Sequence, residues 1–244
     1  MKILFNLIVR LIDFFYKKKI TNFFKKNLKE KFIVLFDVGA HNGETILDFL
    51  NHFSVKNIYS FEASKQTFNN LEKSLTKIKE KFKLVNIEIF NFGVGNSNKE
   101  KIFYELPDSN SSTFNIIDQN SSYFKRKNKI LSFFFLNKQN TINQSKVLQI
   151  KLGDFIKEKK IDHIDILKID TEGYEFNVLL GLKDKLQNVK IVLFEHHYDD
   201  MLKKGYTFTD INALLVKHNF KQIYKIKMPF RKTFEYIYIN KKFN

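Results

Sequence analysis

From residue 32 onward, strand-like and helix-like segments alternate along the chain, and this alternation restricts the fold more than any other feature. The strand-like segments are short, apolar and rich in β-branched or aromatic residues, whereas the helix-like segments repeat apolar residues every three or four positions. This order predicts a mostly parallel sheet that is covered by helices on both faces. We expect strands at 32–38, 57–62, 87–92, 147–151, 164–169 and 189–194, and helices at 44–52, 64–79, 152–159, 174–182 and 209–218, with Ser64 and Thr209 as N-caps.

The last two strand-like segments, 221–227 and 234–239, are joined by a short turn and predict an antiparallel hairpin, because parallel neighbours need a long crossover. A plain dinucleotide dehydrogenase does not end in such a hairpin. With 244 residues, of which 43% are hydrophobic, the chain is long enough for one α/β domain with a sizeable core. We therefore expect a single Rossmann-like domain over residues 32–244, with an insertion at about 96–146.

The formal net charge of +16 would ordinarily indicate nucleic acid or an anionic membrane as a partner. Over most of the chain, however, the lysines are interleaved with acidic residues, so the charge is a weak guide and nucleic acid is not the partner that we expect. The chain contains no cysteine, which excludes disulfides, thiolate metal sites and cysteine nucleophiles and is compatible with a cytoplasmic location.

Residues 1–31 are a local exception, because this segment contains nine Lys or Arg residues and only two acidic residues. The apolar part is too short and too interrupted to span a bilayer, and no signal-peptide cleavage site follows it. As a helix, the segment would have one polar stripe and a broad apolar face. It is either an interfacial helix at the inner face of the membrane or a helix packed on its own domain or on a second subunit of a homo-oligomer, and we favour packing on protein. The stripe consists of Asn6, Arg10, Asp13 and Lys17.

The segment from Asp37 to Gly43, Asp-Val-Gly-Ala-His-Asn-Gly, follows the first predicted strand and begins the first predicted helix. Glycines at these places let the backbone pass close to a ligand, and the helix N-terminus behind them offers free N–H groups and a positive dipole end. A dinucleotide site would carry a further glycine between Gly39 and Gly43. The variant found here suits a cofactor with an amino acid moiety and a sulfonium, namely S-adenosylmethionine, near whose cationic end Asp37 can supply negative charge.

Glu62 ends the second predicted strand, where an acid can accept hydrogen bonds from both ribose hydroxyls of a cofactor. The end of the third predicted strand should face the adenine. Because these motifs stand at the ends of successive strands, they predict one cofactor site. Its expected residues are Asp37, Gly39, Ala40, Asn42, Gly43, Glu62, Ala63, Asn91, Gly93, Val94 and Asp170.

Residues 167–175, Leu-Lys-Ile-Asp-Thr-Glu-Gly-Tyr-Glu, place three carboxylates within six positions after a buried strand. Ligands of open α/β sheets bind at this edge. Glu172 and Glu175 would stabilise the N-terminus of the following helix, an interpretation that we accept for Glu175. Asp170, beside a glycine turn, has no evident structural task.

These motifs make the chain similar to the FkbM family of methyltransferases. The resemblance extends from about residue 33 to 196, and the Asp-Thr-Glu-Gly-Tyr-Glu segment after the cofactor motif is its most specific part. Gly153 departs from the acid that such proteins often carry there. The matching segments are 36–43, 61–63, 91–95, 152–155, 167–175 and 194–195.

The resemblance implies the Rossmann-like fold of class I methyltransferases, with a mostly parallel sheet and a C-terminal antiparallel hairpin. It also implies O-methylation that depends on S-adenosylmethionine, often of sugars or of secondary-metabolite hydroxyls. Bacterial members often belong to polysaccharide synthesis. The expected acceptor is therefore a small molecule or a carbohydrate.

An O-methyltransferase must align the sulfonium with the acceptor hydroxyl and help that hydroxyl to lose its proton. His196 or His197, just after the strand predicted at 189–194, is the expected base, and Asp170 is the alternative. In a second route, Asp170, Glu195 and His196 would bind Mg²⁺, which would acidify the hydroxyl. We favour the metal-free route.

The insertion at 96–146 is rich in Ser, Asn and Lys, and we expect it to be irregular and to cover the acceptor pocket. Its aromatic runs at 102–104 and 131–136 would either stack on sugar faces or form core strands.

Three rival functions stay open. A nucleic acid (RNA) methyltransferase would fit the charge, but the sequence contains no recognised RNA-binding module or base-methylation motif. A nicotinamide oxidoreductase is disfavoured by the missing middle glycine. A non-catalytic, membrane-associated binding module would leave the carboxylates around Asp170 unexplained.

Overall fold

The computed structural model describes residues 18–26, 28, 33–106, 111–134, 142–229 and 231–243, with side chains as far as residue 129 in the second helical part of the insertion. The polar stripe expected on residues 6–17 lies outside the described residues. So do the side chains of the aromatic run at 131–136.

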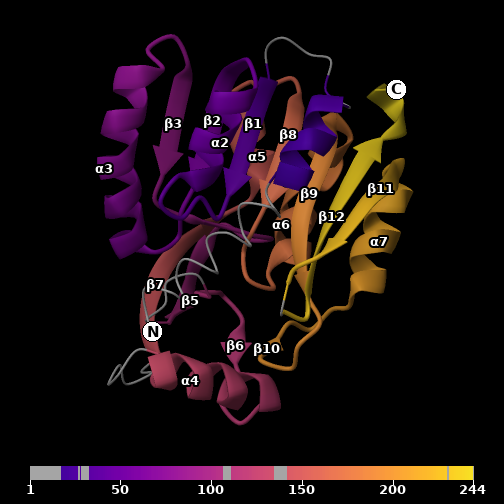
Figure 1. Cartoon of the computed structure of the whole chain (residues 1–244). Coiled ribbons are helices and arrows are strands. Elements are labelled where there is room, and N and C mark those ends of the chain that lie inside the picture. The colour runs from indigo at the N-terminus through magenta and orange to yellow at the C-terminus, as the bar shows by residue number, and fades with distance from the viewer. Residues whose placement is uncertain are drawn as a thin grey trace.

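The main sheet confirms the predicted α/β topology (Figure 1). The five strands from β9 to β3 are parallel to one another, and β12 is antiparallel to both of its neighbours, as the expected hairpin requires. The order across the sheet is β11-β12-β9-β8-β1-β2-β3. The bounds are β1 Ile33–Val38, β2 Val55–Phe61, β3 Asn86–Phe90, β8 Ile164–Ile169, β9 Val189–His197, β11 Phe220–Lys227 and β12 Thr233–Asn240.

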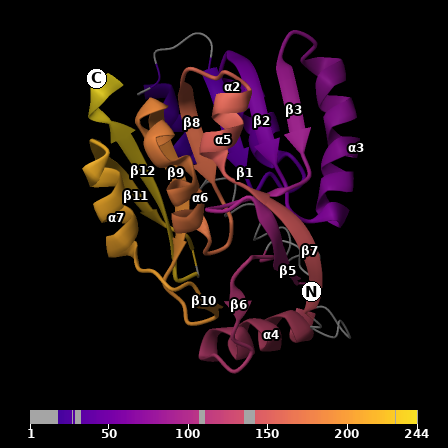
Figure 2. The same cartoon turned by 180° about the vertical axis from the view of Figure 1, so that it is seen from behind.

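Helices cover both faces of this sheet, because the central strands are apolar on both sides. The helices α2 (Glu44–His52) and α3 (Lys65–Lys81) pack on one face, and α5, α6 and α7 pack on the other (Figure 2). The last three span Leu152–Glu158, Glu175–Leu182 and Phe208–Lys217, and the short 3₁₀ helices η1 and η2 span Lys183–Asn188 and Lys241–Phe243.

Local capping signals explain where α3 and α7 begin. The side chain of Ser64 accepts a hydrogen bond from the Thr67 backbone N–H at 3.3 Å, as expected of an N-cap. The expected cap at Thr209 is wrong. The cap of α7 is Thr207, whose side chain and backbone form a capping box with Asp210.

Gly153 has a packing role. A Cβ atom there would lie 2.7 Å from the carbonyl oxygen of Leu182, so the glycine lets α5 approach α6 closely.

The insertion is not irregular, which corrects the prediction. It contains β5 (Lys99–Glu105), β6 (Ile116–Ile117) and α4 (Ser122–Phe134), and β7 (Asn143–Ile150) begins before the strand expected at 147. β5 and β7 are antiparallel, β7 also pairs with β4 (Gly93–Val94), and β6 pairs with β10 (Leu202–Lys203). A small apolar cluster of Leu106, Ile117, Phe124, Met201 and Leu202 holds these pieces together at the carboxyl ends of the central strands (Figure 1).

Residues 18–26 are helical and pack on the same face as α2 and α3. Phe24 is buried against Phe49 and Phe53, and Phe23 stacks on Tyr224. This end of the basic segment therefore contacts its own domain. Within the described part of the chain, no helix combines the length and the apolar character needed to cross a membrane.

Candidate active site

A cavity of about 350 Å³ opens at the carboxyl ends of β1, β2, β8 and β9, beneath the insertion. Predicted cofactor residues that line it are Gly39, Ala40, Glu62, Ala63, Gly93, Val94 and Asp170. Predicted cofactor residues that lie behind its wall are Asp37, Asn42, Gly43 and Asn91.

The glycine loop forms the floor of one half of the cavity. Gly39 has a φ of +84°, and its N–H and that of Ala40 donate to the carbonyl of Phe61 at 2.9 and 3.1 Å. A Cβ atom on Gly39 would lie 1.8 Å from the carbonyl oxygen of Asp170. The loop after β1 is thus pressed against the turn after β8, and only glycine fits there.

Glu62 lies directly after β2, where the sequence places it. Its two carboxylate oxygens accept hydrogen bonds from the backbone N–H groups of His41 and Ser64, each at 2.9 Å. The backbone carbonyl of Glu62 accepts a hydrogen bond from the side chain of Asn91 at 2.9 Å. Burial raises the pKa of Glu62 to about 7, although these hydrogen bonds act against it. Each oxygen keeps a further lone pair, so the carboxylate can accept hydrogen bonds from the two hydroxyls of a ribose in the cavity.

Asp37 does not reach the cavity, which corrects its expected direct role beside the cofactor. It is fully buried and forms an ion pair with Lys168, whose Nζ lies 3.4 Å from Asp37 and 3.3 Å from Asp170. Burial raises the pKa of Asp37 to about 6. Burial alone would lower the pKa of Lys168, but Asp170 and Asp37 raise it, so this ammonium stays charged in the cavity wall.

Lys168 was missed at the sequence level. A lone lysine between Leu167 and Ile169, inside an otherwise apolar strand, is the signal that could have revealed it.

We expect Lys168→Met to destabilise the fold by about 2 kcal/mol at pH 8, since it leaves Asp37 as a buried charge without a counterion. The pKa of Asp37, already raised, would rise further, so the loss should shrink as the pH falls to 5 and Asp37 becomes protonated. Urea unfolding at both pH values measures the difference. Lys159→Met, which removes an exposed ion pair with Glu88, is the control. An equal loss in the two variants would contradict this role of Lys168.

The two histidines of β9 point to opposite faces of the sheet. The sequence placed the end of this strand at 194, but β9 continues to His197, and successive side chains of a strand alternate. Glu195 lines the cavity, and His197 lies on the same side. His196 faces away from them.

His196 is buried among aromatic rings, with centroid distances of 4.7 Å to Tyr198 and 5.6 Å to Phe208. Burial lowers the pKa of His196 to about 3. Its expected roles as base and as metal ligand are therefore wrong, because its ring is outside the cavity. Among the described residues, no three His, Asp or Glu side chains are arranged to hold a metal ion, so the expected set of Asp170, Glu195 and His196 does not fit Mg²⁺.

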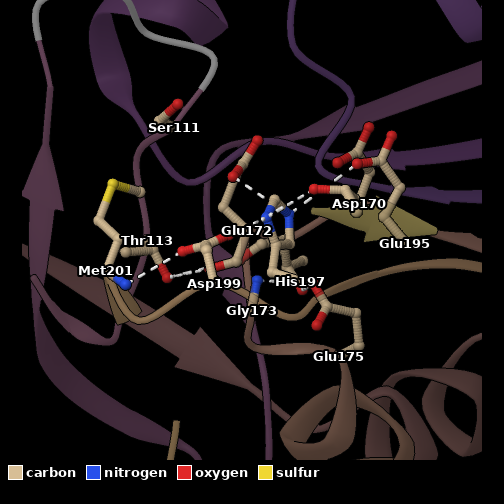
Figure 3. Close-up of polar contacts among 12 residues, drawn as sticks. Ser111, Thr113, Asp170, Glu172, Gly173, Glu175, Glu195, His197, Asp199 and Met201 are labelled. Atoms are coloured by element: carbon tan, nitrogen blue, oxygen red, sulfur yellow. Dashed lines mark hydrogen bonds and ion pairs between the residues drawn. The ribbon is translucent and has the colours of Figure 1, made fainter. Parts of the chain in front are cut away.

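His197 is surrounded by carboxylates (Figure 3). Its Nε2 lies 3.3 Å from Glu172 and 3.9 Å from Glu195, and its Nδ1 lies 3.5 Å from Asp199. Burial alone would lower the pKa of His197, but Glu172, Asp199 and Glu195 raise it to about 10. These carboxylates favour the imidazolium form of His197, which has no lone pair to accept a proton, so its surroundings disfavour the expected role as a base.

The turn after β8 holds Glu172 in an unusual backbone conformation. The backbone of Glu172 has a φ of +49°, a value that residues other than glycine rarely adopt, and Gly173 has a φ of +84°. Thr113 donates to the carbonyl of Glu172 at 2.7 Å, and Asn115 donates to that of Gly173 at 2.6 Å. Residues of the insertion therefore fix this turn.

Glu175, as expected, has a structural role. Its carboxylate accepts the N–H of Gly173 at 2.8 Å and the hydroxyl of Tyr206 at 2.8 Å. Glu172, by contrast, lines the cavity, and burial raises its pKa to about 7. In the sequence, Gly173 directly after Glu172 was the signal that the backbone turns sharply at this place.

The wall of the cavity is acidic although the chain as a whole is basic. Two permanently charged cations line it, Lys168 and Arg231. The lining carboxylates are Glu44, Glu62, Asp170, Glu172, Glu195 and Glu235. Such a wall favours a cationic cofactor and disfavours an anionic acceptor.

Comparison with known proteins gives one family. The family model described as methyltransferase FkbM domain matches residues 37–222. No curated protein matches the chain.

Among solved structures, methyltransferase FkbM from Methylobacillus flagellatus KT is similar over 88% of this chain, with 14% identity and a TM-score of 0.54. This chain spans 46% of the length of that protein, and the likeness concerns the fold. TrmK of M. capricolum, solved with S-adenosyl-homocysteine, aligns with 88% of this chain and 65% of its own, at 16% identity and a TM-score of 0.48.

Proposed function

The chain belongs to the FkbM methyltransferase family, and from this premise we propose that it transfers a methyl group from S-adenosylmethionine to a hydroxyl oxygen of a sugar or a small metabolite. The observation that carries the proposal is a single cavity that joins a cofactor half to an acceptor half. The cofactor half is formed by the loops after β1 and β2. The acceptor half is formed by the turn after β8, the end of β9 and the insertion.

The residues of the cofactor half fit S-adenosylmethionine. Glu62 has lone pairs for ribose hydroxyls, and Phe92 lines the cavity with Gly93 and Val94, where an adenine ring would find an apolar surface. Asp170 would supply negative charge near the sulfonium, and an ion pair with Lys168 at 3.3 Å holds the side chain of Asp170 in place. S-adenosylmethionine would supply an activated methyl group, which leaves its sulfur as a neutral thioether.

The acceptor half suits an uncharged, hydroxyl-bearing molecule. Phe103 and Phe114 of the insertion line the cavity with ring centroids 4.9 Å apart, and the ring of Phe114 lies against Gly93, so the pair stands where the two halves meet. Aromatic rings at this place would offer an apolar surface to the face of a sugar. A nucleic acid would bring phosphates to a wall with more carboxyl groups than permanent cations, which disfavours this acceptor. The side chains that line the cavity, rather than the charge of the whole chain, support the proposed acceptor class.

The test is a transfer assay with tritium-labelled S-adenosylmethionine. One arm offers neutral hexoses, deoxyhexoses and their glycosides, a second offers the matching uronic acids, and a third offers total tRNA. We expect label in a neutral sugar as a methyl ether that resists alkali. Label in tRNA and in no sugar would contradict the proposed acceptor class.

A further inference from the structure

We propose that Glu172 is the general base that accepts the proton of the acceptor hydroxyl, and that His197 and Asp199 position its carboxylate. The inference rests on the proposed function and deepens it. Neither Glu172 nor Asp199 was a candidate at the sequence level.

The geometry places Glu172 on the acceptor side of the cavity. Its turn is fixed by Thr113 and Asn115 of the insertion, and the residue lines the cavity. Figure 3 shows its carboxylate directed toward the ring of His197. Asp170 lies on the cofactor side, because its carbonyl oxygen is the atom that Gly39 approaches. The two carboxylates are thus two positions apart in sequence and serve different halves of the site.

The conformation of Glu172 also indicates function. A non-glycine residue at a positive φ is costly, and such residues persist where surrounding contacts over-determine them. Here Thr113 holds the carbonyl of Glu172, while Asn115 and Tyr206 hold the carbonyl of Gly173. The fold therefore keeps a strained residue in place with its carboxylate at the cavity.

His197 supplies the fixed cation that a positioned carboxylate needs. Its Nε2 faces Glu172 at 3.3 Å, and its Nδ1 faces Asp199 at 3.5 Å. Asp199 is itself held, because it accepts the backbone N–H of Met201 at 3.1 Å. When Glu172 takes up a proton, Asp199 still neutralises the imidazolium, so protonation of Glu172 leaves no buried charge without a partner.

Other groups near the cavity suit the role less well. Asp170 forms an ion pair with Lys168 beside the cofactor half. Burial, with Asp170 and Glu235 nearby, raises the pKa of Glu195 well above its usual range, which favours the protonated form that cannot accept a proton. The pKa of Glu172, raised to about 7, is close to the value that suits a base at neutral pH.

The step balances in atoms and charge. The bond between the sulfur and the methyl carbon breaks, and its electron pair stays on the sulfur. The acceptor oxygen forms the new bond to the methyl carbon, and its proton passes to the carboxylate of Glu172. After product release, Glu172 returns the proton to solvent.

The test uses the full chain with Glu172→Gln, which keeps the shape of the side chain and removes the base. Glu158→Gln, an exposed position on α5, is the matched control. Calorimetry should show that Glu172→Gln binds S-adenosylmethionine within about fivefold of the wild type, because it lies outside the Gly39–Glu62 loops. In the assay with neutral sugars, its kcat should fall by about 10²- to 10³-fold with little change in KM.

The pH profile separates base from scaffold. The titratable and charged groups that interact with Glu172 are His197 and Glu195 on β9, Asp170 after β8, Tyr123 and Lys127 on α4, and Arg231 before β12. The wild-type rate should rise as a group with a pKa of about 7 loses its proton, and Glu172→Gln should lose this rise. Asp199→Asn should shift the rise to lower pH and keep the plateau, because protonation of Glu172 would then leave the imidazolium of His197 without Asp199 as its counterion.

A second readout needs no acceptor. In a histidine-labelled NMR titration, assigned with His197→Gln, His197 should stay protonated beyond pH 9 in the wild type, and its pKa should fall by about one unit or more in Glu172→Gln. An unchanged His197 titration would overturn the ion pair, and a wild-type kcat in Glu172→Gln would overturn the base. A wild type that binds S-adenosylmethionine and methylates no sugar would contradict the proposed function itself, which is a distinct result.

Discussion

Replacing Gly39 by alanine is expected to destabilise the protein by about 4 kcal/mol, a large fraction of the total stability of a domain of this size. The backbone at Gly39 has a φ of +84°, so a side chain costs about 1–2 kcal/mol from the conformation alone. The new Cβ atom would also lie 1.8 Å from the carbonyl oxygen of Asp170, which belongs to the backbone. The loop and the turn after β8 would have to separate.

Gly205→Ala is the matched control for this prediction. Gly205 also has a positive φ, +70°, but an added Cβ atom would meet nothing within 4 Å. Gly205→Ala should therefore lower the free energy of unfolding by about 1 kcal/mol, the cost of the backbone conformation alone. Urea unfolding of both variants measures the difference, and equal losses would show that the close approach to Asp170 is not a constraint on the fold.

Replacing Glu62 by alanine is expected to weaken the binding of S-adenosylmethionine by about 100-fold or more, since hydrogen bonds to a charged group contribute about 1.5–3 kcal/mol each. The loss has two sources. The ribose loses its acceptor, and the N–H groups of His41 and Ser64 lose the oxygens that hold the two loops in place.

Stability should respond differently from binding. Folding raises the pKa of Glu62 to about 7, so the ionised carboxylate is less favourable in the folded protein than in the unfolded chain. Above pH 7 this difference lowers the free energy of unfolding of the wild type, and the variant is free of it. The variant should therefore unfold at nearly the wild-type temperature at pH 8. Equilibrium dialysis with labelled cofactor and a thermal melt test both parts, with the exposed Glu72→Ala on α3 as control. Full binding by Glu62→Ala would remove Glu62 from the cofactor site.

The parts of the fold that repeat a regular pattern could be predicted from the sequence. The bounds of α2 and β8 agree with the expected ones to the residue, because their apolar positions follow one period and turn residues stand at their ends. Glu62 was found for the same reason, since the end of β2 fixes its place. In the insertion, exposed polar positions of β5 and β7 interrupt the alternation, so their pairing could not be read from either strand alone.

The catalytic half of the site was harder to predict than the cofactor half. His196 and His197 are equivalent in sequence, and their roles depend on where β9 ends, which determines the direction of each side chain. The charge of His197 depends on Glu172 and Asp199, which approach it from two loops. Long-range contacts of this kind have no local signal in the chain.

Calorimetric titration of the full chain with S-adenosylmethionine, with NAD⁺ titrated in parallel, tests the proposed cofactor site most directly. We expect saturable binding of S-adenosylmethionine at a single site and no heat from NAD⁺, because the loop after β1 lacks the middle glycine of a pyrophosphate-binding loop. A folded protein that gives no heat with S-adenosylmethionine would overturn the proposal that this chain uses that cofactor.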